Sequence, residues 1–364
     1  MRLRARTIAM VGLLAAGRVG SGAAWLPRFR ENVVQSLRNE AVTGYSLQER
    51  TLVTWGDRLL WRRLPQGRYR VVSGRGRAFS EGGCLLDVDG DGRQDVVVNE
   101  SDGALVWFRA PQAGPGWTRR VIDTGVDAPD ILPATLFGRR GVLLIQKRIQ
   151  VRFYEIPKDV TTRWPYQEVY SFYSPSHQGG LRVADLDSDG LPDILAGNYW
   201  IKSPERFELP WRLFAIEIWN ETPPSAMLRL KYGPLTGRMP ELLAVQREMQ
   251  PARLARFEKP ADPRQLWTEH GLASELELSQ PNSLDVADFD GDGRPDILVA
   301  EKAGAGRVIV LRNESGGRFT PAVIAQGRPV RFARAVDVNG DGRPDVLLIR
   351  ADAIVWLENQ AASQ

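Results

Sequence analysis

Cysteine is almost absent from this sequence, since Cys84 is the single one among 364 residues. One cysteine can form neither an intrachain disulfide nor a paired-cysteine metal or redox site. We therefore interpret Cys84 as a small hydrophobic residue just ahead of a strand. Histidine is nearly as scarce, with only His177 and His270, and no G-x-S-x-G, H-E-x-x-H, phosphate-loop or dinucleotide-binding motif is present. These absences argue against the common hydrolase, metalloprotease and nucleotide-binding classes.

Long hydrophobic runs are also missing. Beyond residue 24, no stretch approaches the roughly 20 apolar residues that a membrane helix needs, so we expect no transmembrane span. Before it, a basic start (residues 2–6), an apolar run (8–16) and small residues (22–24) form the pattern of a secretory signal peptide. We predict that residues 1–24 are this signal peptide, with an uncleaved anchor as the alternative, and that the protein is secreted, periplasmic or at the cell surface.

A surplus of basic charge is confined to this N-terminal segment. The whole chain has 48 Lys and Arg against 44 Asp and Glu, and the four extra charges are Arg2, Arg4, Arg6 and Arg18. Residues 25–364 therefore carry 44 charges of each sign. A balanced surface lacks the basic patch of a general nucleic-acid binder, so we expect no nucleic-acid partner.

What the chain does have is a repeated acidic motif, D-x-D/N-x-D-G-x-x-D, followed by a short aliphatic run. It begins at Asp87, Asp185, Asp288 and Asp337. The intervals between these aspartates are 98, 103 and 49 residues, which fit two periods, two periods and one period of about 50 residues. Units without the motif then fall near residues 38, 136 and 236, and the total is seven.

Each unit reads as four short strands separated by Gly-rich turns, which is typical of a β-propeller blade. An aromatic residue shortly before a proline recurs in most units, as in Trp61 with Pro65. We predict an all-β, monomeric, seven-bladed propeller of four-stranded blades over residues 25–364. The last unit lacks a fourth strand, and the strand-like segment 28–36 is expected to complete it and close the ring. The predicted blades cover residues 38–78, 79–125, 126–174, 175–224, 225–275, 276–327 and 328–364 plus 28–36.

The acidic motif suits calcium because the side chains at positions 1, 3, 5 and 9 and the backbone carbonyl at position 7 can surround one ion with oxygen ligands. Glycine at position 6 makes the reversal of the chain cheap in a left-handed conformation. We predict about four Ca²⁺ ions. The predicted ligand sets are Asp87, Asp89, Asp91, Arg93 and Asp95; Asp185, Asp187, Asp189, Leu191 and Asp193; Asp288, Asp290, Asp292, Arg294 and Asp296; and Asp337, Asn339, Asp341, Arg343 and Asp345.

Two other interpretations of this motif compete with a calcium site. An EF-hand requires a glutamate at position 12 and flanking helices, whereas position 12 here is Val98, Ala196, Val299 or Leu348. A solvated Asp-Gly turn that binds nothing is the alternative that stays open. Four carboxylates within nine residues repel one another without a cation, which favours the calcium interpretation.

The segment DFDGDGRPDILVAE, continued by GRVIVLRNESGGRF, resembles the FG-GAP or VCBS-type repeat of integrin α-subunit propellers and of many exported bacterial proteins. This resemblance implies a calcium-stabilised propeller, usually in adhesion, recognition or scaffolding, but it does not identify a partner. We expect an unknown protein or glycan as the ligand. The alternative is a carbohydrate-active enzyme, such as a lyase or sugar-modifying enzyme, on the same fold. We interpret Trp200 and Trp211 of the segment GNYWIKSPERFELPWRLF as blade-packing residues, and Tyr199 as a candidate surface contact.

Overall fold

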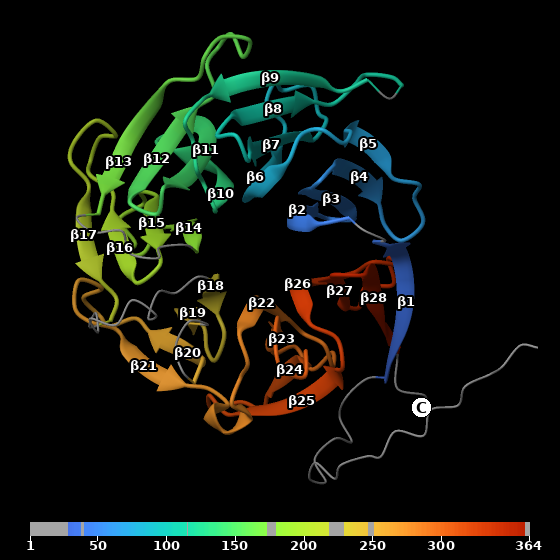
Figure 1. Cartoon of the computed structure of the whole chain (residues 1–364). Coiled ribbons are helices and arrows are strands. Elements are labelled where there is room, and N and C mark those ends of the chain that lie inside the picture. Colours follow the sequence, from blue (N-terminus) through green and yellow to red (C-terminus); the bar gives the residue numbers. More distant parts are fainter. Residues whose placement is uncertain are drawn as a thin grey trace, which may run out of the picture.

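The computed structural model describes residues 28–37, 40–114, 116–172, 180–217, 229–246 and 251–360. The predicted signal peptide (1–24) and His177 lie outside these ranges. Seven four-stranded antiparallel sheets stand around a central axis like the blades of a fan (Figure 1). The prediction of a seven-bladed all-β propeller is confirmed. The short 3-10 turn η3 (Ser274–Leu276) is the helical element in the described ranges, and no helix there is long enough to cross a membrane.

The strands run from the axis outward in each of the first six blades. The first two blades contain β2 (Val42–Gln48), β3 (Thr51–Gly56), β4 (Leu59–Arg63) and β5 (Arg70–Ser73), then β6 (Phe79–Leu86), β7 (Asp95–Glu100), β8 (Leu105–Arg109) and β9 (Thr118–Asp123). The next two contain β10 (Ile131–Leu136), β11 (Arg139–Gln146), β12 (Gln150–Glu155) and β13 (Tyr166–Ser171), then β14 (Leu181–Ala184), β15 (Asp193–Ala196), β16 (Tyr199–Lys202) and β17 (Arg212–Ala215). Blades five and six contain β18 (Arg229–Pro234), β19 (Pro240–Gln246), β20 (Arg253–Glu258) and β21 (Thr268–Gly271), then β22 (Pro281–Ala287), β23 (Asp296–Glu301), β24 (Val308–Asn313) and β25 (Phe319–Ala325).

The seventh blade is built from both ends of the described chain. It combines β26 (Val330–Val336), β27 (Asp345–Arg350) and β28 (Ala353–Gln360) with β1 (Arg28–Ser36) as its outermost strand. The strand β1 pairs antiparallel with β28, from Arg28 opposite Gln360 to Ser36 opposite Ala353. Glu31 of β1 also accepts two hydrogen bonds of 3.0 Å from the buried Arg350. The predicted closure of the ring by an N-terminal strand is confirmed.

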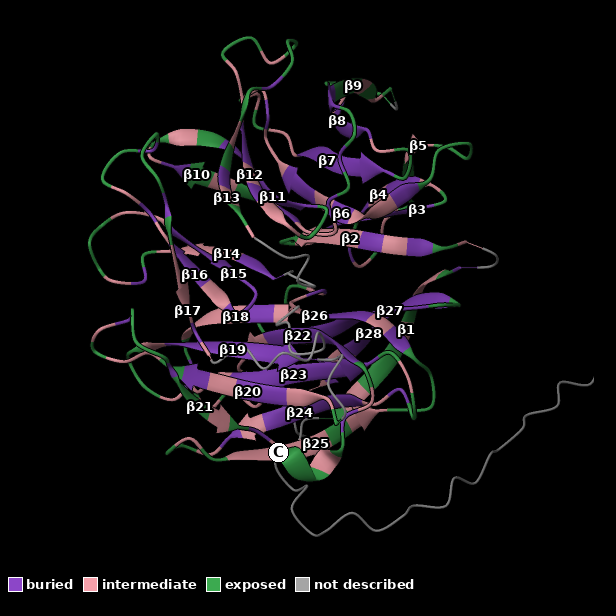
Figure 2. Ribbon diagram, turned by 60° about the vertical axis from the view of Figure 1, so that its left-hand side comes forward, coloured by how far each residue is buried: buried purple, intermediate pink, exposed green. Residues whose placement is uncertain are grey.

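Apolar packing between neighbouring blades holds the ring together. The second strands β7, β23 and β27 are buried along their whole length because a blade covers each of their faces (Figure 2). Seven hydrophobic clusters follow one another around the ring among the described residues, each joining two adjacent blades. The cluster that contains Leu52 of the first blade and Trp356 of the last closes the circle. Cys84 is free and buried, as expected of a small hydrophobic residue.

Candidate metal centres in the aspartate loops

The four acidic motifs occupy equivalent places in the fold. Each forms the hairpin between the innermost strand of a blade and the second strand, after β6, β14, β22 and β26. These are blades two, four, six and seven. The β-branched and aliphatic residues after the motif form the buried second strand, so burial of this strand fixes the end of the loop in space.

The first aspartate shapes the loop by accepting backbone hydrogen bonds. In blade six, Asp288 Oδ1 accepts from the N–H of Gly291 at 2.8 Å, and Asp288 Oδ2 accepts from Gly293 at 2.8 Å. Such turns are a common use of aspartate next to glycine. The glycine at position 6 is left-handed in all four loops, with φ between 81° and 83°, as the sequence predicts.

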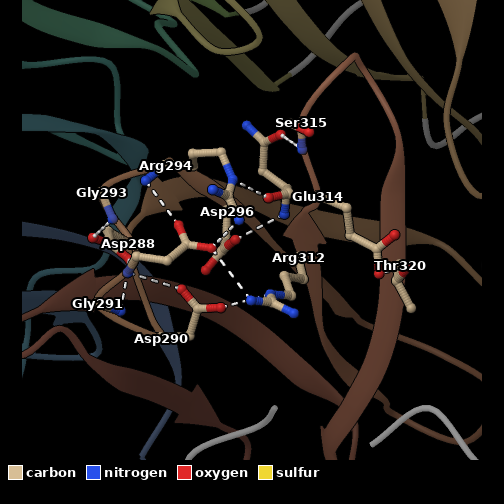
Figure 3. A network of polar contacts seen from close by, with 12 residues as sticks. Asp288, Asp290, Gly291, Gly293, Arg294, Asp296, Arg312, Glu314, Ser315 and Thr320 are labelled. Carbon is tan, nitrogen blue, oxygen red and sulfur yellow. Dashed lines mark hydrogen bonds and ion pairs between the residues drawn. The ribbon is translucent and has the colours of Figure 1, made fainter.

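Three of the four loops bring three carboxylates together. Oxygen atoms from positions 1, 3 and 9 all lie within 4.8 Å of one another in each of these loops. The three sets are Asp87, Asp89 and Asp95; Asp185, Asp187 and Asp193; and Asp288, Asp290 and Asp296. Figure 3 shows the third set, with Asp288, Asp290 and Asp296 pointing toward a common region of the loop.

The aspartate at position 5 points toward position 7. In blade six, Asp292 Oδ1 accepts a 2.9 Å hydrogen bond from the N–H of Arg294, and its other oxygen pairs with the Arg294 guanidinium. Asp91, Asp189 and Asp341 hold the N–H of position 7 in the same way, at Arg93, Leu191 and Arg343. The carboxylate at position 5 is therefore engaged by the loop itself, beside the group formed by positions 1, 3 and 9.

The aspartate at position 9 is fully buried and joins three parts of the blade. Asp296 accepts from the N–H of Phe289 in the loop at 3.0 Å and from the N–H of Asn313, at the end of the third strand, at 2.9 Å. Asp95, Asp193 and Asp345 make the corresponding pairs of hydrogen bonds. Burial raises the pKa of Asp95, Asp296 and Asp345 to about 6, although these N–H donors act in the opposite direction.

A basic side chain from the third strand reaches into each three-carboxylate loop, a feature that the sequence analysis missed. Arg312 Nε lies 2.6 Å from Asp290 Oδ2, and its Nη2 lies 3.4 Å from Asp292 Oδ2 (Figure 3). Arg109 bridges positions 3 and 5 of the blade-two loop, and Lys202 does so in blade four. Burial alone would lower the pKa of Lys202, but its two aspartate partners raise it.

These basic residues share one place in the blade. Each directly precedes the residue whose N–H binds the aspartate at position 9, namely Ala110, Ser203 and Asn313. Their distance from the motif varies in sequence, so no fixed spacing reveals them. An alignment of the third strands, VWFRA, YWIKS and IVLRN, would have found them.

The fourth loop differs at two positions. Asn339 replaces the second aspartate, and this loop does not gather three carboxylates. The residue that corresponds to Arg312 is Glu358, which precedes Asn359 and pairs with Arg30 of β1 at 2.5 Å. This loop thus has one fewer carboxylate in the motif and an acid where the other three have a base.

The first three loops suit a hard divalent cation such as calcium. Asp89 Oδ1 and Asp187 Oδ1 are buried and have no hydrogen-bond partner among the described residues. A buried carboxylate oxygen without a partner is costly, and a cation would satisfy it. Carboxylate oxygens are ligands that calcium prefers, and it takes about six to eight oxygens in all. The side chains that would hold it are those at positions 1, 3 and 9.

The aromatic segment after the blade-four loop is mostly core. Trp200 and Trp211 are buried in blade-packing clusters, as predicted. Tyr199 lies in β16 with its ring centroid 5.5 Å from that of Phe172, and it is half-buried. Only part of this candidate contact is therefore open to a partner.

The fold and the acidic loops define a class: a seven-bladed β-propeller with aspartate-rich hairpins. Residues 288–348 match the FG-GAP-like repeat family, so the chain contains an FG-GAP-like repeat within this propeller. No curated protein matches the sequence.

Similar solved structures support the fold. A chain of the crystal structure of the mitotic checkpoint complex has a TM-score of 0.60 and 11% identity, covering 96% of this chain and 99% of that one. YCF48 from Cyanidioschyzon merolae has a TM-score of 0.55 and 12% identity, covering 90% and 98%. At such low identity these similarities bear on the fold alone.

Proposed function

We propose that this protein is an exported, calcium-stabilised propeller that acts as a recognition, adhesion or scaffold module. The observation that carries the proposal is the threefold repetition of a carboxylate triplet at the same hairpin of three blades. A solvated turn does not require three converging carboxylates, and one such turn would not be copied in three blades. The FG-GAP-like repeat supports the same function.

Calcium in these loops would act on stability. In each triplet, the aspartate at position 9 already accepts hydrogen bonds from the loop and from the end of the third strand, as Asp296 does in blade six. An ion shared with positions 1 and 3 would add the hairpin to this network and offset the repulsion among the carboxylates. Because calcium would hold only the loops at the strand ends, we assign it a structural role. The rigid blades would then provide the surface to which a partner binds.

A binding role is favoured over catalysis by the state of the acids near the axis. Glu81 pairs with Arg229 at 2.6 Å, and Asp285 pairs with Lys231 at 2.5 Å and with Arg334 at 3.0 Å. A general acid or base must exchange a proton with a substrate, whereas Glu81 and Asp285 are held by basic partners. Asp130, another acid at the axis, accepts the backbone N–H of Leu181 at 2.9 Å. We therefore propose a monomeric module for a protein or glycan ligand, with the carbohydrate-active enzyme as the weaker alternative.

The calcium proposal is tested by thermal melting of the protein with a chelator, with calcium and with magnesium. At a hundredfold excess over Kd, one site adds about 2.7 kcal/mol of stability, so calcium should raise Tm by several degrees and magnesium by much less. Superimposable melts in chelator and calcium would contradict the proposal. Export is tested separately by comparing the N-terminus of the protein recovered from cells with residue 25.

A further inference from the structure

The axis of the propeller contains a cavity to which all seven blades contribute. Its volume is about 230 Å³, and it is lined by the innermost strands β2, β6, β14, β18, β22 and β26 and by the start of β10. Figure 1 shows these strands around the central opening. At roughly 30 Å³ per water molecule, this volume corresponds to about eight waters, which suits a ligand of monosaccharide size.

One ion pair crosses this cavity. Arg229 Nη2 of blade five lies 2.6 Å from Glu81 Oε1 of blade two, and Arg229 Nε donates to the carbonyl of Asn282 at 3.0 Å. Burial would lower the pKa of Arg229, but Glu81 raises it above its usual value. This arginine and this glutamate therefore balance each other.

A second acid is shared by two bases. Asp285 Oδ1 lies 2.5 Å from Lys231 Nζ, and Asp285 Oδ2 lies 3.0 Å from Arg334 Nε. Burial lowers the pKa of Lys231, and Asp285 offsets this only in part. The single negative charge of Asp285 is thus shared by two positively charged side chains in a poorly solvated environment.

Arg182 of β14 lines the same cavity and has no carboxylate within ion-pair distance among the described residues. Its hydrogen bond goes to the carbonyl of Leu181, its own neighbour, at 2.6 Å. The nearby Asp130 instead accepts the N–H of Leu181 at 2.9 Å. Burial lowers the pKa of Arg182, and the positive charges of Arg334 and Arg229 add to this effect, whereas the negative charges of Asp130 and Asp285 oppose it. The guanidinium therefore has carboxylates in its neighbourhood but no ion pair of its own within the part of the chain that the structure describes.

The charged residues that line the cavity sum to one excess positive charge. The lining bases are Arg182, Arg229 and Arg334, and the lining acids are Glu81 and Asp130. Lys231 and Asp285 pair with each other and leave this sum unchanged. A monoanion would balance this excess, whereas a phosphate dianion would overshoot it. The planar fork of a guanidinium matches a carboxylate with two parallel hydrogen bonds.

We propose that the axial cavity is a binding site for a small organic carboxylate of monosaccharide size, and that Arg182 is the residue that binds the carboxylate. Tyr45 and Phe332, whose ring centroids lie 4.9 Å apart, line the cavity and offer an apolar surface for the body of the ligand. This inference rests on the proposed recognition function and names the class of ligand.

The axial site is separate from the aspartate loops. In the blades with acidic motifs, the last lining residues of the innermost strands are Gly83, Arg182, Leu284 and Arg334. The aspartate loops begin only after these residues, at Asp87, Asp185, Asp288 and Asp337. Binding of the carboxylate and binding of calcium can therefore be measured independently.

The test is titration calorimetry of the full chain with D-glucuronate and acetate, and with D-glucose as the neutral counterpart of D-glucuronate, at constant ionic strength. We expect saturable binding of one carboxylate per chain and none of D-glucose. Arg182→Gln should weaken binding at least about tenfold, a difference of about 1.4 kcal/mol. The matched control is Arg318→Gln, which removes an exposed arginine paired with Glu314 in the turn between β24 and β25 and should bind as the wild type does.

Several outcomes would overturn the inference: no saturable binding of either carboxylate, equal binding of D-glucose, or unchanged affinity in Arg182→Gln. If Arg182→Gln does not fold, Arg182→Lys takes its place, because it keeps the charge and loses the fork. Binding must then survive but weaken, and an unchanged affinity would contradict the assignment. Thermal melting of the same samples with and without calcium separates the two proposals. A Tm that does not depend on calcium would count against the calcium proposal alone.

Discussion

At the scale of single residues, the four aspartates of each loop in blades two, four and six have different functions. Position 9 is completely buried and accepts hydrogen bonds from two backbone N–H groups, whereas position 3 is more exposed and carries an oxygen without a protein partner in blades two and four. The aspartate at position 9 therefore stabilises the blade even without metal. The aspartate at position 3 contributes to stability mainly when metal is bound.

This difference predicts opposite behaviour of two substitutions in blade six. Asp296→Ala leaves the N–H groups of Phe289 and Asn313 unpaired, at about 1–3 kcal/mol each, and should lower the free energy of unfolding by about 2–6 kcal/mol in chelator. Asp290→Ala breaks a partly exposed pair with Arg312, which is worth about 0–1 kcal/mol. It should be nearly neutral in chelator but should abolish the calcium stabilisation of that loop. Urea denaturation in chelator and in calcium measures both, and equal losses in chelator would refute the division of roles.

The basic residue in each loop competes with the ion for the same carboxylates. Arg312 contacts Asp290 and Asp292, so a calcium ion must either displace its guanidinium or bind beside it. A unit charge at 4 Å is worth about 1–4 kcal/mol at an effective dielectric constant of 80 to 20. Arg312→Leu should therefore tighten calcium binding to the blade-six loop by about tenfold or more. Calorimetry checks this against Arg318→Leu, and unchanged or weaker binding in Arg312→Leu would show that the arginine does not compete.

At the scale of elements, the sequence predicts the blades well because each hairpin is locally encoded. The position of Gly293, the buried run after Asp296 and the recurrence every 50 or so residues determine loop, strand and blade together. Pairing of 28–36 with the last strand was also predictable, since the final unit lacked a strand. The contacts of Arg312 and the hydrogen bond from Asn313 to Asp296 could not be predicted, because they join strands whose spacing in sequence varies between blades. The ion pair of Arg229 with Glu81 joins residues 148 positions apart and leaves no local pattern.

The strand β1 closes the ring and protects the edge of β28, so its removal should affect both stability and association. Deletion of residues 28–36 leaves the buried Arg350 without Glu31, which costs about 3–5 kcal/mol for a buried charge. It also exposes the backbone of β28 to pairing with another chain. We expect a loss of at least about 3 kcal/mol in urea denaturation and dimers or larger species in light scattering. Arg30→Ala, on the exposed side of the same strand, is the control, and a monomeric deletion variant of full stability would refute the role of β1.

At the scale of the whole molecule, the three carboxylate triplets lie in alternate blades. Blades two, four and six carry them, and blades three and five between them have no acidic motif. In a repeat architecture each unit contacts mainly its neighbours. An intervening blade therefore separates each triplet from the next, and electrostatic coupling over such distances is screened within about 10 Å at 0.1 M salt.

This arrangement predicts independent calcium sites. Asp288→Ala should remove one calcium ion from the stoichiometry and leave the affinities of the loops at Asp87 and Asp185 unchanged, because no described contact joins these loops. In the triple variant, with alanine at residues 87, 185 and 288, the three losses of calcium-dependent stability should add within about 0.5 kcal/mol, as they do for distant sites. Calorimetry gives the stoichiometry, and urea denaturation in calcium gives the sum. Sites that weaken together after the single substitution would mean that the ring responds to calcium as one unit, and the loops could then no longer be treated as separate centres.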